Sequence, residues 1–328
     1  MPDLDWSHCG VNYDTGTAYG GEPTRRDWDP GRVAADMTLI ATGLHCDSVC
    51  VYGSDADRLS DAADAAADAG LKVWIQPRAI EGDTSESSAL LDRAARVAAR
   101  LRKAGVKTVL NVGCELSIFA SGIMPGEDYA RRAAKLSTMW WLLPLYHRRL
   151  NRMLGELVTV ARRRYEGPLT YGAALWERVD WRPFDIVGQN YYRLAYNARN
   201  YPARVARFHR YGKPVVITEF GCCAYEGADR LGPSGHEIID FTVRPPRLRN
   251  APVRSEATQA RYIGELLEVY RRTGMAGAFV FEFVAEAHPH TEDPRTDVDM
   301  AGYGLVLPHD RTPKQAFHTV AEFYRRGS

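Results

Sequence analysis

Two glutamates close runs of apolar, β-prone residues and could share acid–base chemistry. Glu115 follows the run at residues 106–112, and Glu219 ends the run at residues 213–219. Cleavage of a glycosidic bond needs two carboxyl groups, one protonated to donate to the leaving oxygen and one ionised to attack or stabilise the anomeric carbon. A single glutamate at a strand end is more often a salt-bridge partner, but two at matching positions favour catalysis.

Other polar or aromatic side chains also stand where apolar runs end, and such positions are candidates for ligand contacts. They are Asn12, Tyr13, Tyr52, Gln76, Trp176, Glu177, Gln189, Asn190, Tyr191, Tyr192 and Glu282. Glu282 would be a third carboxylate near the other two. Its charge would favour a cationic or polyhydroxy ligand, or raise the pKa of a neighbouring acid.

The elements that must position these residues follow a repeated pattern. Four amphipathic segments, at residues 55–69, 90–104, 205–211 and 257–273, each end at a glycine that precedes a β-rich run. A glycine there suits the left-handed residue that closes a helix. Further β-rich runs near residues 10, 50, 171 and 187 bring the expected strands to eight.

Eight strands alternating with helices predict an α/β fold of the (β/α)8 TIM-barrel type, in which polar residues at strand ends gather at one rim. We expect one domain over residues 1–328, with insertions after strands four and seven at residues 116–149 and 222–255. An open doubly wound sheet would need a glycine-rich phosphate loop after the first strand, and residues 10–16 do not form one.

Composition narrows the possible partners. The sequence of 328 residues has 42 Lys and Arg against 41 Asp and Glu, so its net charge of +1 argues against bulk binding of nucleic acid. No secretory signal or membrane-spanning run is visible, which predicts a cytoplasmic protein without a membrane partner. Six cysteines in a long chain of this kind are expected to be free thiols. Oligomeric state is open.

Acidic residues and histidines near the C-terminus leave two interpretations. Residues 286–293, with Asp297 and Asp299, could be a metal site, but their spacing matches no known metal-binding loop. We therefore expect a hydrogen-bonded loop over the barrel mouth, and neither a metal nor a cofactor. A GxSxG motif is also absent, which leaves a serine hydrolase of the common type unsupported.

The glutamates and their neighbours resemble glycoside hydrolase clan A, whose members are retaining enzymes on (β/α)8 barrels. Residues 112–117 are similar to the fourth-strand signature of family 113, the β-mannanase-type members. Residues 169–176, 184–192 and 213–221 resemble the fifth, sixth and seventh strands of that family.

The resemblance implies roles for the candidate residues. Glu115 would be the general acid/base and Glu219 the nucleophile, with Tyr191 or Tyr192 hydrogen-bonded to Glu219. Trp176 would stack on a sugar. The remaining residues would line the site and bind a small-molecule or oligosaccharide substrate: Asn12, Tyr13, Tyr52, Gln76, Asn190 and Glu282.

Two departures from the clan pattern keep other functions open. Cys114 stands where most members have an asparagine, and the eighth strand reads Phe281-Glu282-Phe283 where a tryptophan is common. The first hypothesis is a retaining glycoside hydrolase or transglycosidase for a β-linked sugar. The second is a barrel that uses the same acids as a cyclase, lyase or isomerase of a non-sugar metabolite. The third is an inert barrel with a binding or defence role.

Overall fold

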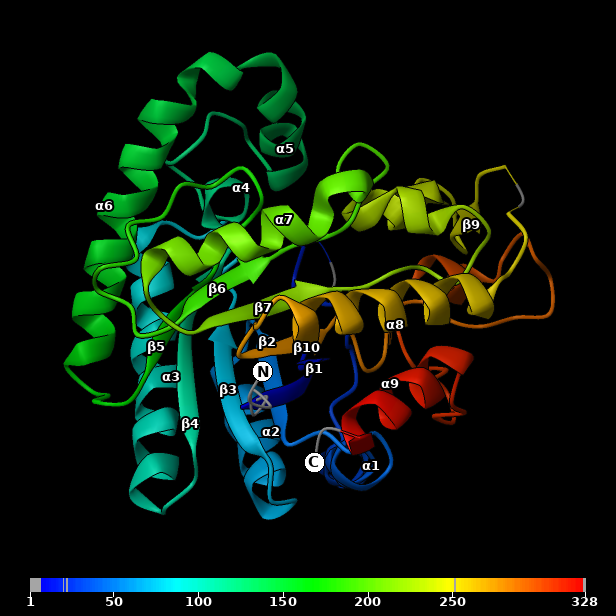
Figure 1. Cartoon of the computed structure of the whole chain (residues 1–328), viewed down its shortest axis with the longest axis horizontal. Coiled ribbons are helices and arrows are strands. Elements are labelled where there is room, and N and C mark those ends of the chain that lie inside the picture. The colour runs from blue at the N-terminus through cyan, green and yellow to red at the C-terminus, as the bar shows by residue number, and fades with distance from the viewer. Residues whose placement is uncertain (1–6, 20, 22, 251, 327–328) are drawn as a thin grey trace. The chain divides into compact units, whose positions relative to one another are not determined.

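The computed structural model describes residues 7–19, 21, 23–250 and 252–326 and shows a (β/α)8 barrel, as the sequence predicts. Its eight parallel strands belong to one sheet (Figure 1). Strands β5, β4, β3 and β2 are neighbours in that order, and β10 lies between β1 and β7. A parallel bridge joins Ala173, which follows β5, to Gln189 of β6. The strands are β1 (His8–Asp14), β2 (Ser48–Gly53), β3 (Lys72–Pro77), β4 (Thr108–Cys114), β5 (Leu169–Gly172), β6 (Val187–Asn190), β7 (Val215–Phe220) and β10 (Gly277–Val280). The eighth barrel strand is labelled β10 because β8 (Ile239–Asp240) and β9 (Arg247–Leu248) form a separate antiparallel pair.

Two compact units make up the chain. Unit 1 consists of residues 1–14, 38–49 and 191–328, and unit 2 of residues 15–37 and 50–190. Unit 1 holds β1, β7 and β10 with helices α7 (Tyr201–Ala206), α8 (Glu256–Arg272) and α9 (Gln315–Arg326). Unit 2 holds most of β2, all of β3 to β6, and helices α2 (Ala56–Asp68), α3 (Thr84–Lys103), α4 (Leu116–Phe119), α5 (Tyr129–Thr138) and α6 (Leu143–Arg162). Helix α1 (Pro30–Thr42) has residues in both units.

The strands of both units are buried along nearly their whole length, as expected when helices cover a parallel sheet. In unit 2, Val73 of β3 pairs with Thr108 of β4, and Leu110 of β4 pairs with Leu169 of β5. In unit 1, β10 lies between β1 and β7 (Figure 1). The register of β1 and β10 pairs His8 with Gly277.

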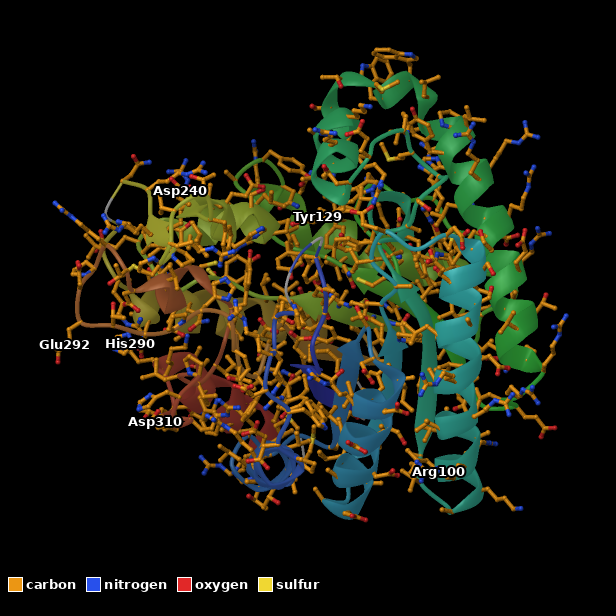
Figure 2. The ribbon with its side chains drawn as sticks, turned by 180° about the vertical axis from the view of Figure 1, so that it is seen from behind. Arg100, Tyr129, Asp240, His290, Glu292 and Asp310 are labelled. Atoms are coloured by element: carbon orange, nitrogen blue, oxygen red, sulfur yellow. The ribbon has the colours of Figure 1, made fainter. Side chains whose placement is uncertain are left out.

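The helices of unit 2 begin at side-chain caps. Asp55 accepts backbone hydrogen bonds at the start of α2, and Asp83 and Glu86 form a capping box at the start of α3. Helix α3 therefore begins at Thr84, six residues before the predicted start. Its solvent side carries Arg100, whose guanidinium binds Asp64 of α2 at 2.7 Å (Figure 2).

The four glycines that were expected to close helices all adopt the left-handed conformation. Their φ angles are 79° at Gly70, 90° at Gly105, 65° at Gly212 and 73° at Gly274. An L side chain is disfavoured at these angles, whereas glycine adopts them freely. The predicted glycine is thus confirmed at all four joints, but the expected helix at 205–211 differs. There, α7 ends at Ala206, and Gly212 closes the 3-10 helix of residues 207–211.

Long segments follow strands four and seven, as expected. Residues 116–149 form α4, α5 and the first part of α6, and residues 222–255 contain short 3-10 turns with the β8–β9 pair. A third long segment, residues 281–314, separates β10 from α9 and was not predicted as an insertion.

Two further expectations concern cysteines and membranes. All six cysteines are buried thiols, and none of them forms a disulfide. In the part of the chain that the structure describes, no helix is both long and apolar enough to cross a membrane.

Candidate active site

Glu115 lies directly after β4 in an unusual backbone conformation. Its φ and ψ angles are 45° and 41°, in the left-handed region, and its amide donates to the carbonyl of Gly172 in β5 at 2.9 Å. Asn190, the last residue of β6, donates from Nδ2 to Glu115 Oε1 at 3.0 Å. Glu115 as a whole is partly exposed, although Cys114 and Leu116 on either side are buried. Glu115 is therefore a partly exposed residue with one carboxylate oxygen held by a hydrogen bond.

Two further residues of unit 2 hold the backbone that follows Glu115. The hydroxyl of Tyr171 accepts from the amide of Leu116 at 2.7 Å, and the carboxylate of Glu177 accepts from the amide of Ser117 at 2.9 Å. Tyr171 also donates to Glu177 at 2.8 Å. Burial raises the pKa of Glu177, while the hydrogen bonds that it accepts act in the opposite direction.

Glu219 lies near the end of β7 in unit 1 and is also partly accessible. The hydroxyl of Tyr192 donates to its Oε1 at 2.9 Å. The ring of Tyr191 instead packs against Tyr201 and Phe208, with ring centroids 5.2 and 5.3 Å away. Of the two tyrosines expected near this acid, the phenol that binds it is therefore that of Tyr192.

Asn12 and Tyr13 lie in the second half of β1 in unit 1, and Glu282 follows β10 by two residues. Asn12 donates from Nδ2 to the carbonyl of Thr218 at 3.1 Å, and its buried Oδ1 has no hydrogen-bond partner among the described residues. Tyr13 is fully buried, with its ring 6.0 Å from that of Phe283. The side chain of Glu282 is 7% exposed. Of these three residues, Asn12 offers an acceptor with no partner in the described chain.

Tyr52 and Gln76 of unit 2 share a partner that sequence reasoning missed. Arg78 follows β3, and its Nε donates to Oε1 of Gln76 at 2.8 Å. Its guanidinium lies over the ring of Tyr52, 3.9 Å from the centroid. All three side chains are buried. The amide oxygen of Gln76 and one face of Tyr52 are thus already engaged by the arginine.

Trp176 is half-buried and is fixed by its indole nitrogen, which donates to Oγ of Ser117 at 2.9 Å. The thiol of Cys114 lies 3.2 Å from Nδ2 of Asn190. This amide nitrogen therefore contacts both the cysteine and Glu115.

Solved structures provide the comparison, because no protein-family model and no curated protein matches the sequence. A GH113 β-1,4-mannanase superimposes with a TM-score of 0.62 at 16% identity, over 97% of this chain and 98% of the mannanase. The GH113 β-mannanase from Alicyclobacillus acidocaldarius, in complex with ManMIm, gives 0.61 at 16% identity over 98% of both chains. A β-glucuronidase from an uncultured Clostridium species gives 0.58 at 16% identity, over 97% of this chain and 50% of its own.

The chain has the fold of these glycoside hydrolases. The resemblance to clan A that the strand ends predicted is therefore confirmed at the level of the fold.

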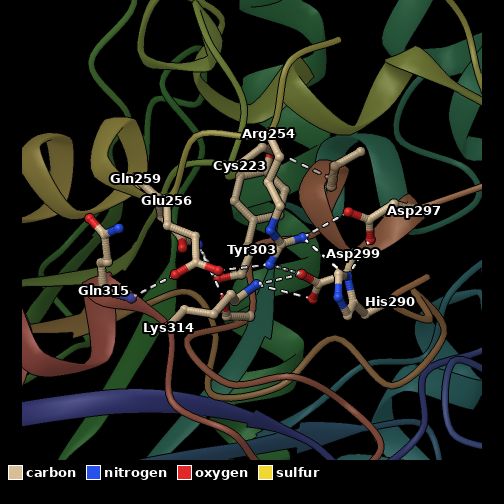
Figure 3. Close-up of polar contacts among 12 residues, drawn as sticks. Cys223, Arg254, Glu256, Gln259, His290, Asp297, Asp299, Tyr303, Lys314 and Gln315 are labelled. Carbon is tan, nitrogen blue, oxygen red and sulfur yellow. Dashed lines mark hydrogen bonds and ion pairs between the residues drawn. The ribbon is translucent and has the colours of Figure 1, made fainter. Parts of the chain in front are cut away.

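Within this glycosidase-like barrel, the acidic C-terminal loop of unit 1 is an ion-pair network (Figure 3). Arg254 binds Asp297 at 2.9 Å and Asp299 at 3.0 Å, and His290 binds Asp297 at 2.8 Å. Lys314 binds both oxygens of Asp299, at 3.0 and 3.2 Å. Ligand atoms of His290, Asp297 and Asp299 lie within 4.8 Å of one another, but two protein cations already neutralise these carboxylates. This arrangement favours a hydrogen-bonded loop over a metal site.

The adjacent cysteines after β7 of the barrel are packing residues. Cys222 and Cys223 are each 1% exposed, and the Cys223 thiol lies 3.2 Å from the carbonyl of Ala301. Burial raises the pKa of both thiols, that of Cys223 to about 12. Because the thiolate is the reactive form, these side chains are poorly suited to redox chemistry at neutral pH.

Proposed function

We propose that the chain is a retaining glycoside hydrolase or transglycosidase for β-linked sugars, with Glu115 as general acid/base and Glu219 as nucleophile. One observation supports this most directly. Asn190, the last residue of β6, donates a hydrogen bond to Glu115, and Tyr192, two residues later, donates one to Glu219. The ends of parallel barrel strands form the catalytic rim in enzymes of this fold, so neighbouring donors on one segment favour a shared site.

The mechanism assigns one step to each carboxyl group. The carboxylate of Glu219, which Tyr192 binds at Oε1, attacks the anomeric carbon while the glycosidic C–O bond breaks. Glu115 gives its proton to the departing oxygen. It then removes a proton from water or a second sugar, which displaces Glu219 and regenerates both acids.

Three features of the chain support a polyhydroxylated substrate. Oδ1 of Asn12 is a buried acceptor suited to a sugar hydroxyl. Trp176 offers a partly accessible indole ring, and its Nε1 bond to Ser117 holds the ring in place. Glu282, two residues after β10, adds a further carboxyl group to unit 1. The β linkage is taken from the structural neighbours, which are β-mannanases and a β-glucuronidase.

Incubation with a panel of 2-fluoro β-glycosides tests the proposal. We expect one sugar to add its mass to the peptide that contains Glu219, and Glu219→Gln to abolish the label. Glu226→Gln is the matched control, because Glu226 is an exposed glutamate seven residues further along unit 1. A crystal structure should place the carboxyl groups of Glu115 and Glu219 about 5–5.5 Å apart. Labelling at another residue, or a separation near 9 Å, would contradict the retaining mechanism.

Cys114 and Glu282 favour a second candidate, in which the same acids act on a non-sugar metabolite. A thiol is a poor hydrogen-bond partner for a sugar hydroxyl compared with the asparagine common at position 114 in clan A. If no glycoside labels Glu219, a cyclase, lyase or isomerase reaction becomes the better hypothesis. Loss of such an activity in both Glu115→Gln and Glu219→Gln would support it.

A further inference from the structure

The turn that carries Glu115 is strained and opens a helix that lacks its own cap. A left-handed conformation costs a residue other than glycine about 1–2 kcal/mol. Glu115 occupies the cap position of α4 but makes no side-chain cap hydrogen bond. The amides of Leu116 and Ser117 lie in the first turn of α4, where no helical carbonyl can accept from them. Something outside the helix must therefore compensate this turn.

Tyr171 and Glu177 supply that compensation. Tyr171 accepts from the Leu116 amide, and Glu177 accepts from the Ser117 amide, so both unsatisfied donors are bound. The other oxygen of Glu177 accepts from the Tyr171 hydroxyl at 2.8 Å and from the amide of Ala174 at 2.9 Å. One buried carboxylate thereby joins the turn after β4 to β5 and to the segment that follows it.

The two oxygens of Glu177 fit this role. It has one oxygen for Ser117 and one for Tyr171 and Ala174, and a carboxylate can accept at both. Burial raises its pKa, while the hydrogen bonds from these residues act in the opposite direction. An amide in its place would put an NH2 group against a backbone N–H and leave that donor unsatisfied, which costs about 1–3 kcal/mol.

We propose that Glu177, acting with Tyr171, is a positioning residue that holds Glu115 in the geometry from which it donates a proton. The assignment rests on the proposed role of Glu115 as general acid. Glu177 contacts the backbone on the C-terminal side of Glu115, while Asn190 fixes the carboxylate itself. Without Glu177 the turn relaxes from the left-handed region, and the carboxyl group moves away from the leaving oxygen.

The dependence of kcat/KM on the leaving group distinguishes this positioning role from a general loss of structure. A 2,4-dinitrophenolate departs without protonation, whereas a sugar or methanol leaving group needs the acid. We expect Glu177→Gln to lower kcat/KM about 100-fold for an unactivated glycoside, and less than about threefold for the dinitrophenyl glycoside of the same sugar. Tyr171→Phe should show the same split, and so provides a second variant if Glu177→Gln folds poorly.

Asp185→Asn is the matched control, because Asp185 accepts from the amide of Leu169 at the other end of β5. We expect both substrates to be affected equally in this variant. Equal losses on the two leaving groups in Glu177→Gln would overturn the proposal.

A crystal structure of Glu177→Gln tests the positioning without any activity. We expect φ of Glu115 to leave the left-handed region and the bond to Asn190 to break. An unchanged Glu115 overturns the inference. If the wild-type protein cleaves no glycoside, the proposed function fails, and this structure still decides whether Glu177 holds the turn.

Discussion

The hydroxyl of Tyr192 and the carboxylate of Glu219 are joined by a hydrogen bond of 2.9 Å within unit 1. The backbone reinforces this pair, because the amide of Tyr191 donates to the carbonyl of Glu219 at 2.9 Å. The segment after β6 is thus bound to the end of β7 through both main chain and side chain. A phenol that binds one oxygen of a carboxylate also orients the other.

Tyr192→Phe should therefore slow the reaction that Glu219 performs. Hydrogen bonds to charged groups contribute about 1.5–3 kcal/mol, so we expect kcat to fall about 10- to 100-fold. Steady-state kinetics on the glycoside that labels Glu219 would measure this. Tyr225→Phe is the control, because it removes a hydroxyl that binds the carbonyl of Gly235, at 2.8 Å, and not Glu219. Equal activity in the two variants would show that the bond to Glu219 has no catalytic role.

His288 should destabilise the protein in acid. Burial and the nearby His236 lower its pKa to about 4, and its buried Nδ1 has no hydrogen-bond partner in the described part of the chain. An unfolded histidine has a pKa of about 6.5, so between these values the unfolded state binds more protons. The free energy of unfolding should fall as pH falls from 6.5 towards 4, by about 1–3 kcal/mol in total.

Denaturant unfolding between pH 4 and 7 checks this expectation. His288→Gln should flatten the pH dependence, whereas His309→Gln, at a residue whose side chain is 76% exposed, should leave it unchanged. A wild-type slope in His288→Gln would rule out the proposed titration.

Lys314→Met should destabilise unit 1 strongly. Lys314 and Asp299 are 1% and 0% exposed, and the lysine binds both oxygens of the aspartate. Removing one partner of a buried pair typically costs about 3–5 kcal/mol, because the remaining charge is left poorly compensated. Guanidinium unfolding at pH 7 would measure this loss.

Two further variants test why Lys314→Met lowers the free energy of unfolding. Adding Asp299→Asn to Lys314→Met should recover part of the stability, since the stranded charge is removed. Arg100→Met is the control, because Arg100 pairs with Asp64 at the surface and such pairs contribute less than about 1 kcal/mol. If Lys314→Met costs no more than Arg100→Met, the network of Figure 3 does not stabilise the fold.

Cys223 should resist alkylation in the native protein. With its pKa raised to about 12, the thiolate fraction at pH 8 is about 10³-fold below that of an ordinary cysteine. Treatment with iodoacetamide followed by peptide mass spectrometry should show almost no modification of Cys222 or Cys223, but full modification in urea. Rapid labelling of the native protein would instead support a redox-sensitive pair.

Local signals predicted the framework of the barrel well. The four helix-closing glycines and the apolar runs are properties of neighbouring residues, and the strands formed where those runs stand. The start of α3 was missed because the residues before Leu90 are polar. The capping box of Asp83 and Glu86 was the signal that could have placed it.

Contacts between distant residues explain what the sequence could not show. Glu177 stood out only as a polar residue after a strand, and its bond to Ser117 spans 60 positions. Arg78 was missed because it lies two residues beyond Gln76, where the apolar run had already ended. Its stacking on Tyr52 depends on how the strands pair, which the local sequence does not show. The left-handed turn at Glu115 likewise depends on partners in β5 and beyond.

The pairing of β1 with β10 has a consequence for synthesis on the ribosome. His8 pairs with Gly277 and Val11 with Val280, so the first strand lacks one of its neighbours until nearly the whole chain has been made. At about 5–20 residues per second, that wait is roughly 15–50 s. Residues 50–190 of unit 2 are contiguous and can begin to fold earlier. A chain truncated before residue 277 would leave an edge of β1 exposed to aggregation, even with Glu115 and Glu219 both present.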